Sequence, residues 1–378
     1  FEADASASPA YMTDAPNLFN GNIKRMVTTF TDIKPGSPTI GQALPQITAY
    51  KYDQLNRIAQ LKAYRDINVS TNVSGAATSN AYLSTMSYDA NGNLLTMNVN
   101  GEASNLGMDQ LQYKYDWYDV NDPSKGKRSN RLYHIKDPTT STYTTDIDDP
   151  GTNFTPYDPL NPTNINTMNM YGYDELGNLK RDDQEKISQI DWTVYGKIKS
   201  IQRSVTTKPT LDFTYDANGN RVSKISTLNG VLTGTYYVRD ASGNIMATYD
   251  YNKTSLASVP TVTDYSLYGS SRVGTATGYA SFIKGVSVYS RVRKNKNYEL
   301  SNHLGNVLAV VSDKRQPHTS NGTTIDYYDP TVLSTQDYYA FGAPMPGRGF
   351  TPSTSTYRYG FNGKEKDDEV KGAGNSQD

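Results

Sequence analysis

The chain of 378 residues contains no cysteine and only three histidines. The lack of cysteine excludes a thiol nucleophile, a disulfide framework and a cysteine-ligated zinc site. None of His134, His303 and His318 stands in a serine or cysteine arrangement that suggests a catalytic triad. For His303 we expect an imidazole that is bonded to the backbone. We therefore predict no enzymatic activity, no catalytic residue, no metal site and no cofactor.

An excess of charge of one sign and long apolar runs are also missing. Lysine and arginine number 37 against 38 acidic residues, so the formal net charge is −1. No global basic field is present to recruit nucleic acid. No apolar run approaches the length of about 20 residues that a membrane helix needs. We expect neither a nucleic-acid partner nor a membrane span. The chain begins at Phe1 without Met, and we expect it to be a piece of a longer polypeptide.

Tyrosine is abundant where other large apolar residues are scarce. The sequence has 31 Tyr against 9 Phe and 2 Trp, and its hydrophobic content is 36%. A phenol ring can lie on a sheet and still reach water or a polar partner. This composition favours a large sheet with solvent on both faces. A stack of ordinary β-sandwiches is the alternative, and the regular repeat described next argues against it.

A short phrase recurs: Tyr-Asp, two variable residues, Gly-Asn and an apolar residue. Tyr is typical of strands, Asp accepts backbone hydrogen bonds that start a turn, and Gly supplies a positive φ. The phrase therefore encodes strand, turn and strand, and the later copies recur about every twenty residues, a period typical of repeat arrays. One early variant carries Asn56 in place of the glycine. The repeat residues are Tyr52, Asp53, Tyr88, Asp89, Gly92, Tyr173, Asp174, Gly177, Tyr215, Asp216, Gly219, Asp240 and Gly243.

These phrases resemble the YD repeat of the RHS (rearrangement hotspot) and teneurin-type proteins. The segments 302–307, 337–348 and 357–367 are similar to the RHS-repeat-associated core segment in its Bacteroidetes form. The resemblance implies an all-β fold, in which a long antiparallel sheet of repeated hairpins spirals into a hollow shell, and this chain would form part of that shell. The matching core residues are His303, Gly305, Tyr338, Phe341, Gly342, Pro346, Gly347, Arg348, Tyr359, Phe361, Gly363 and Lys364.

Five segments follow from the repeats and the composition. Residues 1–44 are expected to form a first strand and a linker, and residues 45–117 the first YD repeats. Residues 118–170 are predicted to be an irregular insertion loop, because Pro, Thr and Asp are frequent there. Residues 171–300 are predicted to be further YD repeats. Residues 301–378 form the core-like segment, which we expect to be incomplete at its C-terminus.

Three charged stretches are candidates for binding. A solvated strand edge, rather than a phosphate site, is predicted for the basic run Arg291, Arg293, Lys294 and Lys296. The acidic residues between Asp116 and Asp149 offer oxygen ligands for calcium, but they lack a known calcium-binding spacing and favour a loop. The run 364–369 contains charges of both signs and predicts a solvated turn or short helix. These stretches supply no predicted site.

The resemblance implies a shell function for this chain but no catalytic residue. Shells of this family suggest a secreted or cell-surface wall that encloses or presents its own C-terminal module or another polypeptide, as a polymorphic toxin cage does. The alternative is a surface adhesin or scaffold, for example in adhesion or gliding motility. It would be exported by a type IX-like route, with export machinery or cell-surface ligands as partners. The family's aspartyl self-cleavage motif would lie downstream, and Asp367 and Asp368 do not match it.

The repeats also predict local geometry. We expect an almost helix-free chain with hairpin turns at Asn91-Gly92, Gly177-Asn178, Asn218-Gly219 and Ser242-Gly243. Tyr88, Tyr173 and Tyr215 are expected to stand in cross-strand ladders. Replacement of Gly219 is expected to destabilise more than replacement of Gly101, which lies outside a YD phrase.

Overall fold

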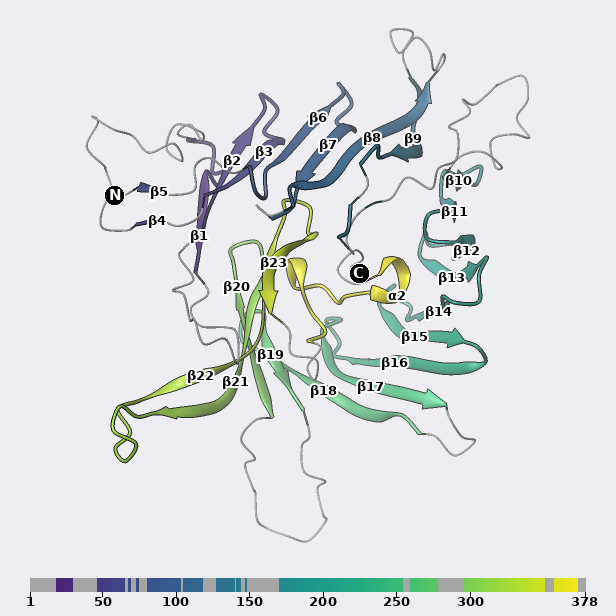
Figure 1. The fold of residues 1–378 in the computed structure, drawn as a ribbon. Helices are drawn as coiled ribbons and strands as arrows, with labels where there is room; N and C mark the ends of the chain where they lie inside the picture. The colour runs from purple at the N-terminus through teal and green to yellow at the C-terminus, as the bar shows by residue number, and fades with distance from the viewer. Residues whose placement is uncertain are drawn as a thin grey trace. The chain divides into compact units, whose positions relative to one another are not determined.

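The chain is almost entirely antiparallel β-structure in the part that the computed structural model describes (Figure 1). Within that part, helical structure is confined to a 3-10 turn, η3 (Phe361–Gly363), and a four-residue helix, α2 (Asp368–Lys371). The prediction of an all-β, nearly helix-free chain is confirmed. The described residues are 18–29, 46–64, 67–68, 73–74, 80–102, 105–117, 127–139, 141–143, 147, 170–253, 259–277, 295–350 and 357–372.

The first sheet has seven strands in the order β1-β2-β3-β6-β7-β8-β9, and all pairs are antiparallel. A separate two-stranded ribbon pairs β4 (Ile67–Asn68) with β5 (Val73–Ser74). The strands of the sheet are β1 (Arg25–Thr28), β2 (Gln46–Tyr52), β3 (Ile58–Tyr64), β6 (Ser84–Tyr88), β7 (Leu94–Asn100), β8 (Gly107–Trp117) and β9 (Lys127–Lys136).

The second sheet has fourteen strands, β10 to β23, in which neighbours in sequence are neighbours in space. This order is that of a continuous series of hairpins. The strands are β10 (Tyr171–Tyr173), β11 (Leu179–Asp182), β12 (Ile187–Trp192), β13 (Ile198–Arg203), β14 (Thr210–Tyr215), β15 (Arg221–Leu228), β16 (Val231–Arg239), β17 (Ile245–Lys253), β18 (Thr261–Tyr268), β19 (Arg272–Ala276), β20 (Lys296–Ser301), β21 (Val307–His318), β22 (Tyr327–Tyr338) and β23 (Pro344–Phe350).

The chain divides into two compact units. The first comprises residues 1–170 and 336–350, and the second comprises residues 171–335 and 351–378. The first unit has a buried cluster around Leu61, Tyr82 and Tyr339. The second has one cluster around Ile201 and Leu211 and another around Val310 and Tyr359. Each unit therefore has its own small buried clusters, as expected for repeated hairpins.

Each YD phrase forms the same five-residue turn. In the first clear copy, the amide of Asp89 donates to the carbonyl of Asn93 at 2.9 Å, and the amide of Gly92 donates to the carbonyl of Asp89 at 3.1 Å. Gly92 has a φ of +88°, which side chains disfavour. This pattern is that of a three-residue hairpin loop whose last residue is left-handed. The predicted turns are confirmed, and the same bonds close 53–57, 174–178, 216–220 and 240–244.

The Asn after the glycine completes the turn. Asn220 donates its backbone amide to Oδ1 of Asp216 at 2.8 Å and its side-chain amide to Oδ2 at 3.0 Å. The side-chain hydrogen bond from Asn220 is the main reason that the pKa of Asp216 lies below its usual value. In the variant turn, Asn56 supplies the positive φ (+63°), and Arg57 donates to Asp53 in place of the missing Asn.

Four further turns share this hydrogen-bond pattern without the Tyr-Asp pair. They are 193–197, 302–306, 339–343 and 360–364. Three of them carry predicted core residues at the left-handed position, namely Gly305, Gly342 and Gly363. The core-like segment therefore continues the hairpin geometry of the repeats.

Successive hairpins are joined by a hydrogen bond from the tyrosine of the phrase. The hydroxyl of Tyr88 donates to the carbonyl of Ile58 at 2.7 Å, and that of Tyr215 donates to the carbonyl of Ile198 at 2.8 Å. The acceptor is the first residue after the turn of the preceding hairpin. The same link runs from Tyr52 to Ile23, from Trp192 to Leu179, from Tyr268 to Ile245 and from Arg239 to Arg221. The cross-strand ladders of Tyr88, Tyr173 and Tyr215 stay a prediction, and the described contacts of Tyr88 and Tyr215 include these links to backbone.

The two ends of the strands in the second sheet differ in how they are connected. At one end, the connections are the five-residue turns from 174–178 to 339–343, with one shorter turn at 269–271. At the other end, the connections range from Asn229 and Gly230 alone, between β15 and β16, to residues 277–295, between β19 and β20.

Three expectations differ from the structure. Residues 127–136 of the expected insertion loop form β9, because they pair with β8 and bury Tyr133 and Ile135. A Cβ at Gly101 would overlap the ring of Tyr143, so Gly101 is not a tolerant position. His303 is exposed in the turn 302–306, and none of the described hydrogen bonds joins its imidazole to the backbone.

Candidate functional site: the C-terminal segment on the second sheet

The C-terminal segment, residues 357–371, lies along one face of the second sheet, and strands β10 to β18 follow an arc around it (Figure 1). It runs from β20 at Tyr357 to β11 at Lys371. Its contacts to the sheet are made by side chains from many strands. The contacting residues of the sheet are Glu299, Arg272, Asp264, Asp250, Thr235, Tyr237, Arg221, Lys224, Arg203 and Asp182.

The first end of the segment is fixed by two tyrosines and an arginine. The hydroxyl of Tyr357 donates to Glu299 at 2.7 Å, and the guanidinium of Arg272 stacks on the ring of Tyr359 at 3.4 Å from its centroid. Arg272 also bonds Glu299 and donates to the carbonyl of Gly363. Both tyrosines belong to one buried cluster with Val307 and Val310. Apolar burial and a cation–π contact therefore act together here.

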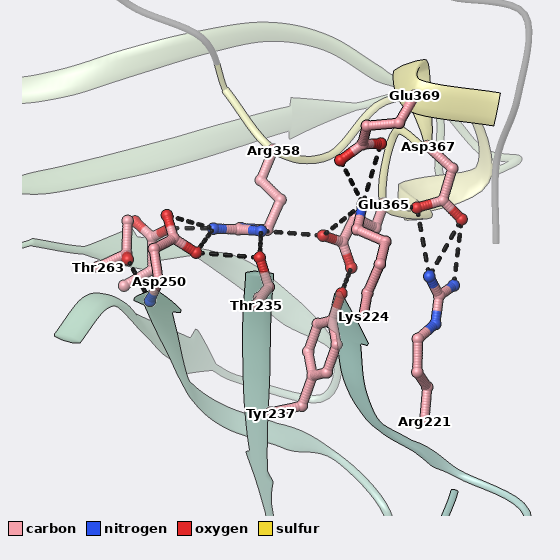
Figure 2. A network of polar contacts seen from close by, with 11 residues as sticks. Arg221, Lys224, Thr235, Tyr237, Asp250, Thr263, Arg358, Glu365, Asp367 and Glu369 are labelled. Atoms are coloured by element: carbon pink, nitrogen blue, oxygen red, sulfur yellow. Dashed lines mark hydrogen bonds and ion pairs between the residues drawn. The ribbon is translucent and has the colours of Figure 1, made fainter. Parts of the chain in front are cut away.

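The middle of the segment is an ion network (Figure 2). Arg358 pairs with Glu365 of the segment at 2.9 Å and with Asp250 of β17 at 3.1 Å, and its Nε lies 3.5 Å from Asp264 of β18. The ion network is defined as Arg221, Lys224, Asp250, Asp264, Arg358, Glu365, Asp367 and Glu369.

Two basic residues of β15 bind the acidic residues of the segment. Arg221 donates both terminal nitrogens to Asp367 at 3.1–3.2 Å, and Lys224 donates to Asp367 at 2.9 Å. Lys224 also pairs with Glu369 at 3.0 Å. The side chains of Arg221 and Lys224 are only 5% and 6% exposed. Such buried charges are tolerated only when they are paired and hydrogen-bonded.

The protonation equilibria reflect this pairing. Burial would raise the pKa of Asp367, but Lys224 and Arg221 outweigh it and hold that pKa below its usual value. Burial would lower the pKa of Lys224, but Asp367 and Glu365 raise it above its usual value. Burial, and then the charge of Glu365, raises the pKa of the Tyr237 hydroxyl, which donates to Glu365 at 2.8 Å. The pairing therefore favours the ionised forms of Asp367 and Lys224 and a neutral Tyr237.

The last turn of the segment is held by its backbone and by one apolar contact. Arg203 donates to the carbonyls of Glu369 and Val370 at 2.6 and 3.0 Å, and Lys371 pairs with Asp182 at 3.2 Å. Val370 packs on the cluster that contains Ile201. The segment is thus anchored by apolar contacts at both ends and by ions in between.

The prediction of a solvated turn or short helix at 364–369 was wrong for Glu365 and Asp367, whereas Lys364 and Asp368 are exposed and the short helix α2 begins at Asp368. Glu365 and Asp367 are buried, because alternate residues of an extended segment point to one face and here that face meets Arg221 and Lys224. The alternation of Glu365, Asp367 and Glu369 was visible in the sequence. The basic partners Arg221 and Lys224 were not recognised, since they lie far away in the sequence.

The structure distributes the predicted site residues between the two units. The repeat residues lie along the turns and do not converge. Tyr359, Phe361, Gly363 and Lys364 belong to the C-terminal segment, and Gly305 lies beside it, where Asn306 accepts from the amide of Asn362 at 2.8 Å. His303 lies in the turn 302–306 of the second unit, and the other core residues group in the first unit. There, Arg348 bonds Asp337 at 2.6 Å and Tyr82 donates to the carbonyl of Pro346. That group also includes Tyr338, Phe341, Gly342 and Gly347.

The charged stretches from the sequence are only partly described. Asp137 accepts the amides of Gln110 and Thr139, which is a turn-forming role. Among the described residues, no group of acidic or histidine side chains is arranged to hold a metal ion. The described part of the chain also has no helix long and apolar enough to cross a membrane. Residues Arg291, Arg293, Lys294, Asp119, Asp122, Asp146, Asp148 and Asp149 lie outside the described residues.

Comparisons with known proteins give structural matches only. No family model matches the chain, and no curated protein matches it. Among solved structures, the chain is similar to TcdB2-TccC3-TEV (14% identity, TM-score 0.33), to the Tc holotoxin pore of Photorhabdus luminescens (14%, 0.38) and to TcdB2-TccC3 without its hypervariable C-terminal region (13%, 0.34). Each match covers 86% of this chain and 16% of the other, so this chain spans only a small part of the proteins that it resembles.

Proposed function

We propose that this chain is part of the wall of an RHS-type β-shell that holds a polypeptide on one face and does not itself catalyse a reaction. The single observation that supports the proposal most is that residues 357–371 bind along the second sheet. That polypeptide segment is held by side chains from β11, β13 and β15 to β20. The face is therefore suited to hold an extended polypeptide.

The charged side chains that bind residues 357–371 favour one position of this segment on the sheet. A buried ion pair adds little net stability compared with apolar residues, but it penalises every arrangement that leaves one charge unpaired. Displacement of the segment along the sheet would separate Asp367 from Arg221 and Lys224. The ion network therefore favours one register of the segment on the sheet.

The finer identity rests on the sequence. The YD phrases and the core-like segments support an RHS protein of the Bacteroidetes form, secreted or at the cell surface. In this reading, the shell encloses the polypeptide that continues from its core segment, as a toxin cage would. The C-terminal module or another polypeptide would be its partner.

Protection of an attached polypeptide tests the proposal. An unstructured, epitope-tagged reporter is fused after Asp378, and its digestion by a nonspecific protease is followed by immunoblot. We expect slower digestion than for the same reporter fused to an unrelated folded domain. Arg221→Met with Lys224→Met, which releases the segment, should abolish the difference. Equal digestion rates with the intact segment would refute enclosure.

A second candidate function is surface binding. The distal part of the hairpin β21–β22 projects from the sheet (Figure 1), and Ile325, Tyr327 and Tyr328 are each about half exposed there. Exposed tyrosines are frequent in protein interfaces. If the reporter is not protected, loss of cell-surface binding in Tyr327→Ser with Tyr328→Ser would support the adhesin alternative, with Tyr195→Ser as the exposed control.

A further inference from the structure

A pocket of about 600 Å³ adjoins the C-terminal segment on the same face of the second sheet. Its floor is made by small polar side chains of β15 to β18, among them Ser226, Thr233 and Thr261. Four charged residues of the ion network also line it: Lys224, Asp250, Arg358 and Glu369. Its volume is within the usual range for ligand sites, about 300–1,000 Å³.

The cations at this pocket are already engaged. Arg358 directs its nitrogens to Glu365, Asp250 and Asp264. The ammonium of Lys224 contacts Asp367 and Glu369 at 2.9 and 3.0 Å. Their side chains are largely buried, at 16% and 6% exposure. An anionic ligand would therefore have to displace an existing carboxylate before it could pair with either cation.

The carboxylates that line the pocket, unlike the cations, can still accept hydrogen bonds from a ligand. The ion network holds five carboxylates and three cations, so two negative charges are in excess. The two lining carboxylates are its most exposed members: the side chain of Asp250 is 46% exposed and that of Glu369 is 35% exposed. Each carboxylate has about four acceptor positions. Asp250 and Glu369 therefore retain acceptor capacity on the open side.

We propose that this pocket binds the cationic side chain of an arginine or lysine from a polypeptide that lies on the same face. The charged residues that line the pocket balance, two cations against two carboxylates, but the ion network around it holds two more carboxylates than cations and so favours a cation. The hydroxyls and amide of the floor suit the several donors of a guanidinium. The pocket opens beside the C-terminal segment, where the proposed function places a held polypeptide. The inference thus rests on the proposed function for its source of ligand, and it adds the chemistry that the face recognises.

Binding of a small probe tests the pocket without the shell. Nα-acetyl-arginine amide carries one guanidinium and no other charge, and Nα-acetyl-citrulline amide is its neutral counterpart of the same shape. We expect saturable shifts in a nuclear magnetic resonance titration of the full chain with the arginine probe and none with citrulline. Asp250→Asn and Glu369→Gln should each weaken binding about tenfold, the loss of one charge-assisted contact. Asp329→Asn, at an exposed carboxylate of β22, should leave binding unchanged.

The outcomes separate this site from the proposed function. Equal binding of arginine and citrulline probes, or unchanged affinity in both carboxylate variants, would overturn the cation site. Absence of saturation with the arginine probe would overturn it as well. A melting temperature measured for each variant shows whether a loss of binding comes from unfolding, and Asp250→Glu, which keeps the charge, should retain binding if the site is correct. Failure of this titration leaves reporter protection to be judged by its own assay.

Discussion

Removal of the charge on Asp367 should destabilise the second unit strongly. In Asp367→Asn, Arg221 loses its two-nitrogen ion pair with Asp367 while it remains 5% exposed. Lys224 keeps Glu369 at 3.0 Å and Glu365 at 4.0 Å, so Lys224 loses only part of its pairing. Breaking a buried pair by removing one partner costs about 3–5 kcal/mol. Because one of the two cations keeps its partners, we expect the lower part of that range, about 3 kcal/mol.

Urea denaturation measures this loss. The midpoint should fall without a change in the slope, because the surface exposed on unfolding stays the same. The control is Asp329→Asn, which removes the partner of His318 at 3.4 Å where both side chains are about half exposed. Such a pair is worth about 0–1 kcal/mol.

A double variant separates the free energy lost when one partner is removed from the net contribution of the ion pair to stability. Arg221→Met with Asp367→Leu replaces both ions by apolar residues, and it should recover a large part of the stability lost in Asp367→Asn. The reasoning is refuted if Asp367→Asn costs as little as Asp329→Asn, or if the double variant is less stable than the single one.

Three more predictions concern the turns, the links and pH. Gly219→Ala should cost about 1–2 kcal/mol, since φ is +78° there, whereas Gly269→Ala, with negative φ and ordinary contact with its neighbour, should cost much less in the same titration; equal costs would count against the turn geometry. Tyr215→Phe should cost about 1 kcal/mol through loss of its backbone link, and Tyr195→Phe, at an 87% exposed ring, should be neutral by thermal unfolding. The pKa of Asp367 is lowered on folding, so its contribution is present above the unfolded pKa of about 3.9 and is lost as pH falls through the folded pKa. The stability difference between the native chain and Asp367→Asn should therefore shrink below about pH 4, and a difference independent of pH would contradict this assignment.

The sequence predicted what is local. The Asp and Gly of each phrase close a turn within five residues, so the hairpins could be located from spacing alone. The Asn after the glycine was read as part of the phrase but not as a donor to Asp216, since its role depends on the turn conformation. The strand β9 was missed because the prolines and acidic residues around it outweighed the alternation of Tyr133 and Ile135.

The candidate site could not be predicted in the same way. The alternation of Glu365 and Asp367 is equally compatible with a solvated surface and with a buried face. The choice depends on Arg221 and Lys224, which are more than a hundred residues away in the sequence. Only the order of strands in the sheet brings those residues beneath the C-terminal segment.

The unequal connections at the two ends of the strands have a consequence for how such a chain can change over time. The five-residue turns are closed by fixed bonds and adjoin the tyrosine links, so an added residue there would break both the turn and the joint to the next hairpin. The opposite connections already vary from two residues to the stretch 277–295, and doubling the length of a flexible loop costs only about 0.6 kcal/mol. Insertions, grafted epitopes and new recognition loops should therefore accumulate on that side. One side of the sheet preserves the repeat, and the other is free to diversify.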